Sequence, residues 1–165
     1  IPLLDEMNNW IADTDLELKS LLAITETYFK APGDDVYANG PVTYLRMDEL
    51  PAPGSYAPIV DVLARGDYFV STGEVVVPSV EVGGSGAEAS VTARVSGKVR
   101  VDLAEVAAAA RRTSARLVDS AAELPPVASR TFSVPFDATG VAWVRFAAWD
   151  VAGNGAMTMP VRLAR

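Results

Sequence analysis

The stretch ASVTARVSGKVRVDL (89–103) alternates apolar with polar residues, with one irregularity at Ser96 and Gly97. Because successive side chains of a β-strand point to opposite faces, a period of two is typical of a strand with one buried face. The stretch therefore predicts β-structure that packs against a second layer. Its apolar positions are Val91, Ala93, Val95, Val99, Val101 and Leu103.

Similar short runs stand on both sides of this stretch, separated by the turn signals GGSG, LPP, DATG and AGNG. Six or seven strands with such spacing predict an antiparallel, immunoglobulin-like β-sandwich over residues 74–165. The other runs are EVVVPSVEV (74–82), SARLVDS (114–120), RTFSVPF (130–136), VAWVRFAAWD (141–150) and AMTMPVRLA (156–164).

The segment AEVAAAARR (104–112) is compatible with two structures, a strand and a helical turn. Its alanines give it the highest helix propensity of the chain. Val106 nevertheless follows the alternating run directly, and close sheet packing would also require small side chains. We favour a strand and keep a helical turn as the alternative.

Residues 1–73 show a different pattern, in which the sequence predicts helices as well as strands. The spacing of Leu3, Leu4, Met7, Trp10 and Ile11 predicts a short amphipathic helix over residues 2–12. The sequence predicts strands over residues 16–25, 41–48 and 67–73. The first of them ends in LLAIT, an apolar run that is typical of a strand buried on both faces of a parallel sheet. A second helix over YAPIVDVLARG (56–66) has Ser55 as its expected cap and Gly66 as its expected C′ residue.

Composition limits the classes of function. The chain has 165 residues, a formal net charge of −7, no Cys and no His. A nucleic-acid backbone would be repelled, and no run approaches the ~20 apolar residues of a membrane-spanning helix. Without His and Cys, catalytic Ser-His-Asp or Cys-His arrangements are excluded, and any metal would need oxygen ligands.

The order of segments in the first half resembles a known family. LLAITETYF (21–29), PVTYLRMD (41–48) and IVDVLARGDYFVSTGEVVV (59–77) look like the closing part of the polymerase-and-histidinol-phosphatase (PHP) type of metallohydrolase, in its carbaryl-hydrolase-like subgroup. The resemblance covers about residues 15–80. It implies that residues 1–73 are the terminal βα elements of a β/α barrel, followed by a β-sandwich tail, so that the whole chain is an α+β fragment.

The resemblance also implies an altered site. The family's barrel strand ends in Ser/Thr-Asp-x-His, which falls here on Thr25, Glu26 and Tyr28. Glu26 could hold a metal through its carboxylate, whereas neutral Tyr28 is a poor substitute for imidazole. A solvated strand end is the simpler explanation of these residues. We assign no catalytic residue, metal ligand or cofactor to this chain, and expect a divalent metal only in a parent barrel.

Three further features have structural and functional explanations. PGDDVYANG (32–40) is rich in oxygen ligands but lacks the spacing of a calcium loop, so we favour a turn. WDVAGNG (149–155) predicts a hairpin capped by Asp150 and Asn154, with positive φ at Gly153 and Gly155. Trp143, expected to be partly exposed, and Trp149 are too far apart along one strand to sandwich a sugar ring.

These observations favour a non-catalytic C-terminal fragment whose sandwich is a structural and interaction module. Its partner would be the remainder of the barrel, in the same precursor or another chain, and self-association would be a second way to cover residues 1–73. One alternative is a secreted immunoglobulin-like module that binds carbohydrate or protein. The other is a hydrolase site to which Glu26 contributes and which another chain completes. An extracytoplasmic location is compatible with the sandwich.

Overall fold

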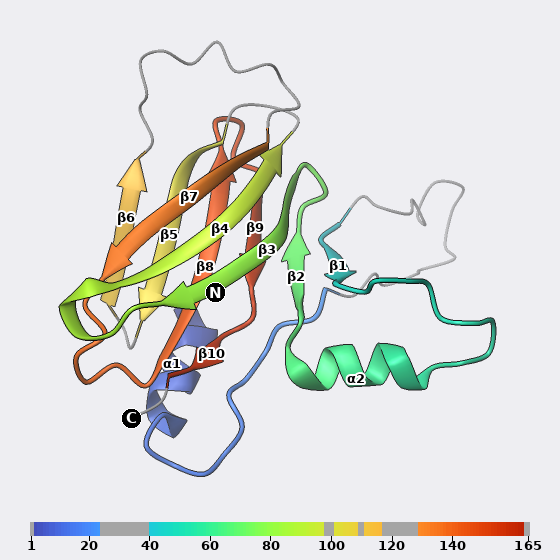
Figure 1. Ribbon diagram of the computed structural model, residues 1–165, viewed down its shortest axis with the longest axis horizontal. Helices are drawn as coiled ribbons and strands as arrows, with labels where there is room; N and C mark the ends of the chain where they lie inside the picture. The colour runs from blue at the N-terminus through green and yellow to red at the C-terminus, as the bar shows by residue number, and fades with distance from the viewer. Residues whose placement is uncertain (1, 24–39, 98–100, 109–110, 117–128, 164–165) are drawn as a thin grey trace.

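Two β-sheets and two short helices make up the part of the chain that the structure describes. The computed structural model describes residues 2–23, 40–97, 101–108, 111–116 and 129–163 (Figure 1). The helices are α1 (Pro2–Ile11) and α2 (Ala57–Arg65), with a 3-10 turn, η1 (Gly86–Glu88). The strands are β1 (Val42–Leu45), β2 (Tyr68–Ser71), β3 (Val75–Gly83), β4 (Ala89–Gly97), β5 (Val101–Ala108), β6 (Arg111–Arg116), β7 (Ser129–Phe136), β8 (Trp143–Asp150), β9 (Gly155–Thr158) and β10 (Val161–Arg162).

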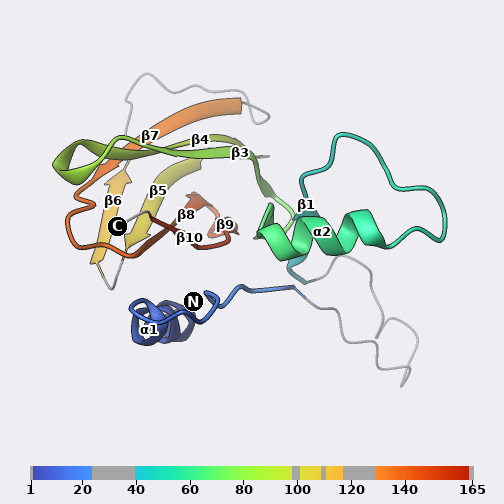
Figure 2. The ribbon, with the colours of Figure 1, turned by 60° about the horizontal axis from the view of Figure 1, so that its bottom comes forward.

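The strands form a larger and a smaller antiparallel sheet. The larger sheet has the order β1-β2-β9-β8-β5-β6, with β10 pairing the start of β8, and the smaller sheet has the order β3-β4-β7. The two sheets lie face to face (Figures 1 and 2). The two antiparallel sheets are consistent with a β-sandwich, but β1 and β2, which lie outside the predicted range 74–165, belong to its larger sheet.

The main core lies between the sheets. Val91, Ala93 and Val95 of β4 are fully buried there, as their alternation predicts. Val144 and Phe146 of β8 face them from the larger sheet. The other members of this core are Phe69, Val75, Val77, Ala89, Val106, Phe132, Val134, Phe136, Val141, Ala148 and Ala156.

The second face of the larger sheet is covered by the N-terminal segment. Figure 2 shows α1 and the chain that follows it on the opposite side of the larger sheet from β3, β4 and β7. Tyr68 and Val70 of β2 pack on this side with Met157 and Met159, and Leu4 of α1 borders them. The central strands of the larger sheet are consequently buried on both faces, with a sheet on one side and α1 with its following segment on the other.

The predicted barrel elements are wrong. All recorded strand pairs are antiparallel, including β1 with β2 and β2 with β9, whereas a β/α barrel is built from parallel strands. The described residues 16–23 form no strand. Ala23 instead meets β1 through the side chain of Thr43, which accepts a hydrogen bond from the Ala23 N–H at 3.0 Å. Within the described residues, no barrel is evident, and the strand order gives no support to an immunoglobulin-like arrangement.

Double-sided burial explains this error. The β2 sequence YFVS lies in the segment that the resemblance assigns to the barrel, and it is buried at every position, as a strand of a parallel sheet usually is. Phe69 instead faces the sandwich core, and Tyr68 and Val70 face the cover that the N-terminal segment provides. An antiparallel strand becomes apolar on both faces when both faces are covered.

The local predictions for the helices hold with one exception. Gly66 ends α2 in the left-handed conformation, at φ 70°, and its N–H donates to the Leu63 carbonyl while Asp67 N–H donates to the Val62 carbonyl. This is the predicted C-terminal cap. Ser55 does not cap the helix: the N-cap residue is Tyr56, which makes no side-chain cap hydrogen bond. Neither described helix has the length and apolar content to span a membrane.

The described parts of the alanine-rich segment 104–112, residues 104–108 and 111–112, are extended, as we favoured. They supply the end of β5 and the start of β6, which pair from Leu103 with Arg116 to Ala108 with Arg111. Ala107 is buried against the Trp143 ring. A small side chain is needed here because Trp143 fills this part of the covered face, so tertiary packing overrides the helix propensity of the alanines.

Candidate functional site

The predicted barrel-site positions Thr25, Glu26 and Tyr28 lie outside the described residues, as does most of the turn at 32–40. Their proposed role as an altered metal position stays a prediction. Among the residues that the structure does describe, no group of three or more Asp or Glu side chains could hold a metal ion. The remaining candidate surfaces of the described residues are those of α1 and of the groove beside α2.

A buried ion pair fixes α1 to the larger sheet. Arg145, in the middle of β8, is fully buried and points to the covered face of the sheet. Its Nε and Nη2 atoms donate to the two carboxylate oxygens of Asp5 at 2.7 and 2.6 Å. Bidentate contacts of this kind fix orientation as well as distance. The Asp5 side of α1 is thus the side that faces the protein.

Further polar contacts hold the same face of α1. Asn8 is fully buried, and its amide bonds both the N–H and the carbonyl of Lys19, at 2.7 and 3.0 Å. The Trp143 indole N–H donates to Asn9 Oδ1 at 3.1 Å. Arg162 donates to the carbonyls of Ala12 and Leu16, both at 2.8 Å, and so satisfies backbone groups at and after the end of the helix.

The apolar side of α1 is turned outward. Trp10 is 71% exposed, Leu3 66% and Met7 36%. The predicted apolar stripe exists, but only Leu4 and Ile11 at its border are half-buried. Most surface helices place the apolar side against the core and the polar side in water. In α1 the arrangement is reversed, and we call Leu3, Met7 and Trp10 the outer face of α1.

The two tryptophans of β8 do not form an exposed platform. Trp143 is 0% exposed, so its predicted partial exposure is wrong. The cause is α1, whose Asn9 bonds the indole, together with Ala12 and Leu18. Trp149 is half-buried and packs against the cluster that contains Tyr68, Val70, Met157 and Met159. Trp143 is therefore not available for stacking on a sugar, and the half-buried Trp149 forms no exposed platform with it.

The turn after β8 joins β8 to β9 and is stabilised by hydrogen bonds to Asp150. Asp150 accepts hydrogen bonds from the N–H groups of Ala152 and Asn154, both at 2.9 Å, and from the Asn154 side chain at 3.1 Å. Gly153 has φ 86°, as predicted for this turn. The predicted caps are confirmed, and the oxygen atoms of Asp150 are used within the turn itself.

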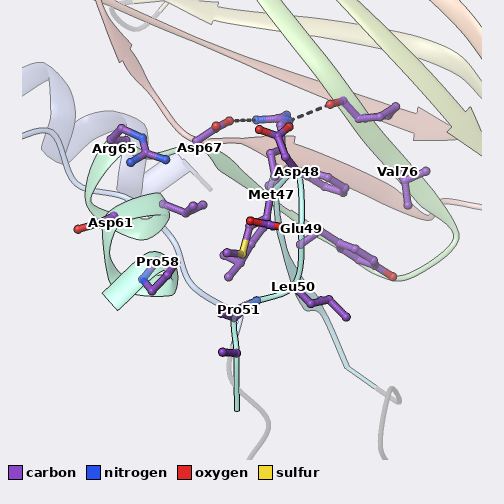
Figure 3. Close-up of a pocket in the computed structure, with 17 residues that line it drawn as sticks. Met47, Asp48, Glu49, Leu50, Pro51, Pro58, Asp61, Arg65, Asp67 and Val76 are labelled. Atoms are coloured by element: carbon purple, nitrogen blue, oxygen red, sulfur yellow. Dashed lines mark hydrogen bonds and ion pairs between the residues drawn. The ribbon is translucent and has the colours of Figure 1, made fainter. Parts of the chain in front are cut away.

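An open groove lies between the β1–α2 loop, α2 and β3 (Figure 3). Its volume is about 890 Å³. Arg46 is the anchored side chain of its wall: Nη2 donates to the Val77 carbonyl at 2.9 Å, Nε to the Pro78 carbonyl at 3.1 Å, and Nη1 contacts Asp67 at 3.3 Å. The guanidinium also lies 5.5 Å from the centre of the Phe69 ring, which stacks on Tyr44.

The remaining charges of the groove do not converge. Asp48 and Glu49 extend from the loop, whereas Asp61 and Arg65 belong to α2, and in Figure 3 the Asp61 carboxylate points away from Met47 and Glu49. Hydrolytic chemistry needs an acid, a base or a metal within hydrogen-bond reach of one point. The groove lacks that geometry, and its Arg46 contacts hold the bulged part of β3 against β1 and β2.

Tyr68 of β2 is a buried phenol on the covered face of the larger sheet. Burial under the N-terminal segment raises its pKa above the ordinary value of 10, and a hydrogen bond with Ser20 opposes that effect. The hydroxyl therefore stays protonated over the neutral range. Tyr68 acts as a packed side chain beneath the segment that follows α1.

Comparison with known proteins gives no family. No family model, curated protein or solved structure matches this chain.

The contact between Asp5 and Arg145 was not predicted from the sequence. The two residues are 140 positions apart, so no local spacing connects them. One signal was available: Arg145 interrupts the apolar run VAWVRFAAWD, and a charge inside a buried strand requires a counterion. Nothing in the sequence identifies Asp5 among the 21 acidic residues as that counterion.

Arg46→Met is expected to lower the free energy of unfolding by about 1–3 kcal/mol, because it leaves two carbonyls of β3 without their donor. Arg65→Met is the matched control on the same groove, since Arg65 is exposed and makes no hydrogen bond or ion pair with another side chain of the described residues. Its loss should be about 0.5 kcal/mol or less. Urea denaturation of both variants measures the difference, and equal losses would contradict an anchoring role for Arg46.

Proposed function

We propose that this protein is a non-catalytic structural and interaction module, a β-sandwich that binds another polypeptide through the outer face of α1. One observation carries the proposal: α1 buries Asp5 and Asn8 and exposes Leu3, Met7 and Trp10. The protein's own sheet is thus contacted mainly by polar groups, and the apolar side is left for a second surface.

The energetics of the buried ion pair support this interpretation. Taking Asp5 and Arg145 out of water costs several kcal/mol per ion before their attraction offsets it. Apolar side chains of similar volume would hold a helix on this sheet at least as well. The polar attachment does, however, fix which side of α1 points outward. Exposed tryptophan on such a face is a common anchor of protein interfaces.

The PHP resemblance suggests a class of partner. In this proposal the partner is a metal-dependent hydrolase domain, in the same precursor or on another chain, and the sandwich buttresses it. Burial of Trp143 and Trp149 gives no support to the carbohydrate-binding alternative. The secreted binding module is the first alternative, with carbohydrate or protein as its ligand. Of these two ligands, only protein agrees with an exposed apolar face on α1.

Site-specific photo-cross-linking tests the proposal. A photoreactive phenylalanine analogue replaces Met7 in one variant and Val82 of β3 in a matched control, because both side chains are 36% exposed. Irradiation is carried out in the cells that produce the protein. We expect a discrete adduct from position 7 that maps to one apolar surface of one polypeptide.

The adduct should disappear when Trp10→Asp is added, because a carboxylate in the contact removes the apolar anchor. The Val82 position should not give the same adduct. If positions 7 and 82 label the same set of proteins, or if Trp10→Asp leaves the adduct unchanged, the outer face of α1 is not a binding surface.

A further inference from the structure

The outer face of α1 has the spacing of a helix that inserts into a groove. Leu3, Met7 and Trp10 stand at positions i, i+4 and i+7, so they share one side over two helical turns. Recognition of a helix by a groove uses anchors with this spacing. Trp10 is the largest and most exposed of the three and is the expected central anchor.

Acidic side chains outnumber basic ones near this face, although the exposed Arg162 lies beside Asp15 and Glu17 and the exposed Lys19 follows them in the chain. The sequence from residue 2 to residue 18 contains no Lys or Arg. Glu6 is exposed beside Met7, and Asp15 and Glu17 are exposed in the segment that follows α1. Figure 2 shows that this segment stays on the same side of the larger sheet as α1. Asp5 does not add to the border, because it points inward to Arg145.

We infer that the surface which receives α1 is an apolar groove bordered by Lys and Arg on a different protein. This inference rests on the proposed function and specifies the chemistry of its partner. Carboxylates at the rim of an apolar contact attract a basic rim and repel an acidic one. A second copy of this chain would bring the acidic borders together at a net charge of −7 each, so a heterologous partner fits better.

The test uses two amphipathic helical peptides of about three heptads with the same leucine seam. One peptide carries lysine at the positions that flank the seam and the other carries glutamate. Binding of each labelled peptide to the full chain is followed by fluorescence anisotropy at low and high salt. The lysine peptide should bind about ten-fold more tightly at low salt, and the difference should shrink at high salt.

Two triple variants distinguish the effect of the carboxylates near α1 from the effect of the net charge of the whole protein. Glu6→Gln, Asp15→Asn and Glu17→Gln together should remove the preference for lysine while both peptides still bind. Asp48→Asn, Glu81→Gln and Glu88→Gln together change the net charge equally at exposed positions elsewhere and should leave the preference intact. Trp10→Ala should weaken binding of both peptides.

Several results would overturn the inference. They are equal binding of the two peptides, stronger binding of the glutamate peptide, no binding of either peptide, or equal effects of the two triple variants. Sedimentation that shows a dimer which Trp10→Ala dissociates would assign the face to a second copy instead. None of these results removes an adduct formed at position 7 in cells, so failure of the charge inference and failure of the proposed function remain distinguishable.

Discussion

Replacing Asp5 with alanine is expected to lower the free energy of unfolding by about 3–5 kcal/mol, because it leaves the buried guanidinium of Arg145 without its main counterion. The Arg145 side chain is 0% exposed and that of Asp5 is 8% exposed, so water does not screen the pair in the folded protein. Urea denaturation followed by far-ultraviolet circular dichroism measures the loss.

A double-mutant cycle gives the control for this prediction. The cycle compares the single variants Asp5→Leu and Arg145→Met with the double variant. The double variant removes both charges and keeps apolar volume, and should cost much less than Asp5→Ala alone. A loss of under about 1 kcal/mol for Asp5→Ala, or simple additivity of the two single changes, would show that the pair does not hold α1 on the sheet.

Gly155→Ala is expected to destabilise the protein by about 1–3 kcal/mol or more, since the added methyl group overpacks the site. A Cβ atom at this position would lie 2.2 Å from Trp149 Cε3 and 2.5 Å from Cζ3, and β9 pairs with β8 at this point. The ring would have to leave its place against the Met157 cluster. Thermal unfolding of the variant measures the loss.

Gly83→Ala is the matched control. Gly83 lies at the end of β3, has no positive φ, and has nothing within 4 Å of an added Cβ. Its substitution should change stability by about 0.5 kcal/mol or less. Trp149→Leu should also rescue part of the loss in Gly155→Ala. Equal losses in the two alanine variants would contradict packing of the Trp149 ring on Gly155.

The reason for glycine at position 155 illustrates what a sequence can predict. We expected positive φ at both Gly153 and Gly155, and only Gly153 has it. A turn signal is local, so the hairpin and its Asp150 caps could be predicted. The approach of the Trp149 ring to Gly155 depends on the pairing of β8 with β9, which no local pattern describes.

The same distinction applies to the sheets. The period of two in β4 predicts a buried face correctly because one face meets the facing sheet and the other meets solvent. In β2 and β8 the period is lost, because the N-terminal segment covers the second face. The apolar run of β2 then resembled a parallel barrel strand, although its direction is set by pairing with β1 and β9.

The candidate site was predicted only in part. The spacing in residues 2–12 predicts a helix with an apolar stripe, but spacing does not state which side of a helix faces the protein. That choice is made by Asp5, Asn8 and Asn9, whose partners Arg145, Lys19 and Trp143 lie on other elements. The outward direction of Trp10 follows from these contacts and not from its own surroundings.

Hydroxyl-radical footprinting with residue-resolved mass spectrometry tests the orientation of α1 most directly. It compares the oxidation rates of Trp10 and Trp143, two side chains of the same chemistry that are 71% and 0% exposed. We predict fast oxidation of Trp10, and protection of Trp143 that Asp5→Ala reduces. Protection of Trp10 in the monomer together with fast oxidation of Trp143 would mean that α1 turns its apolar side to the sheet, and would contradict the proposed interaction surface.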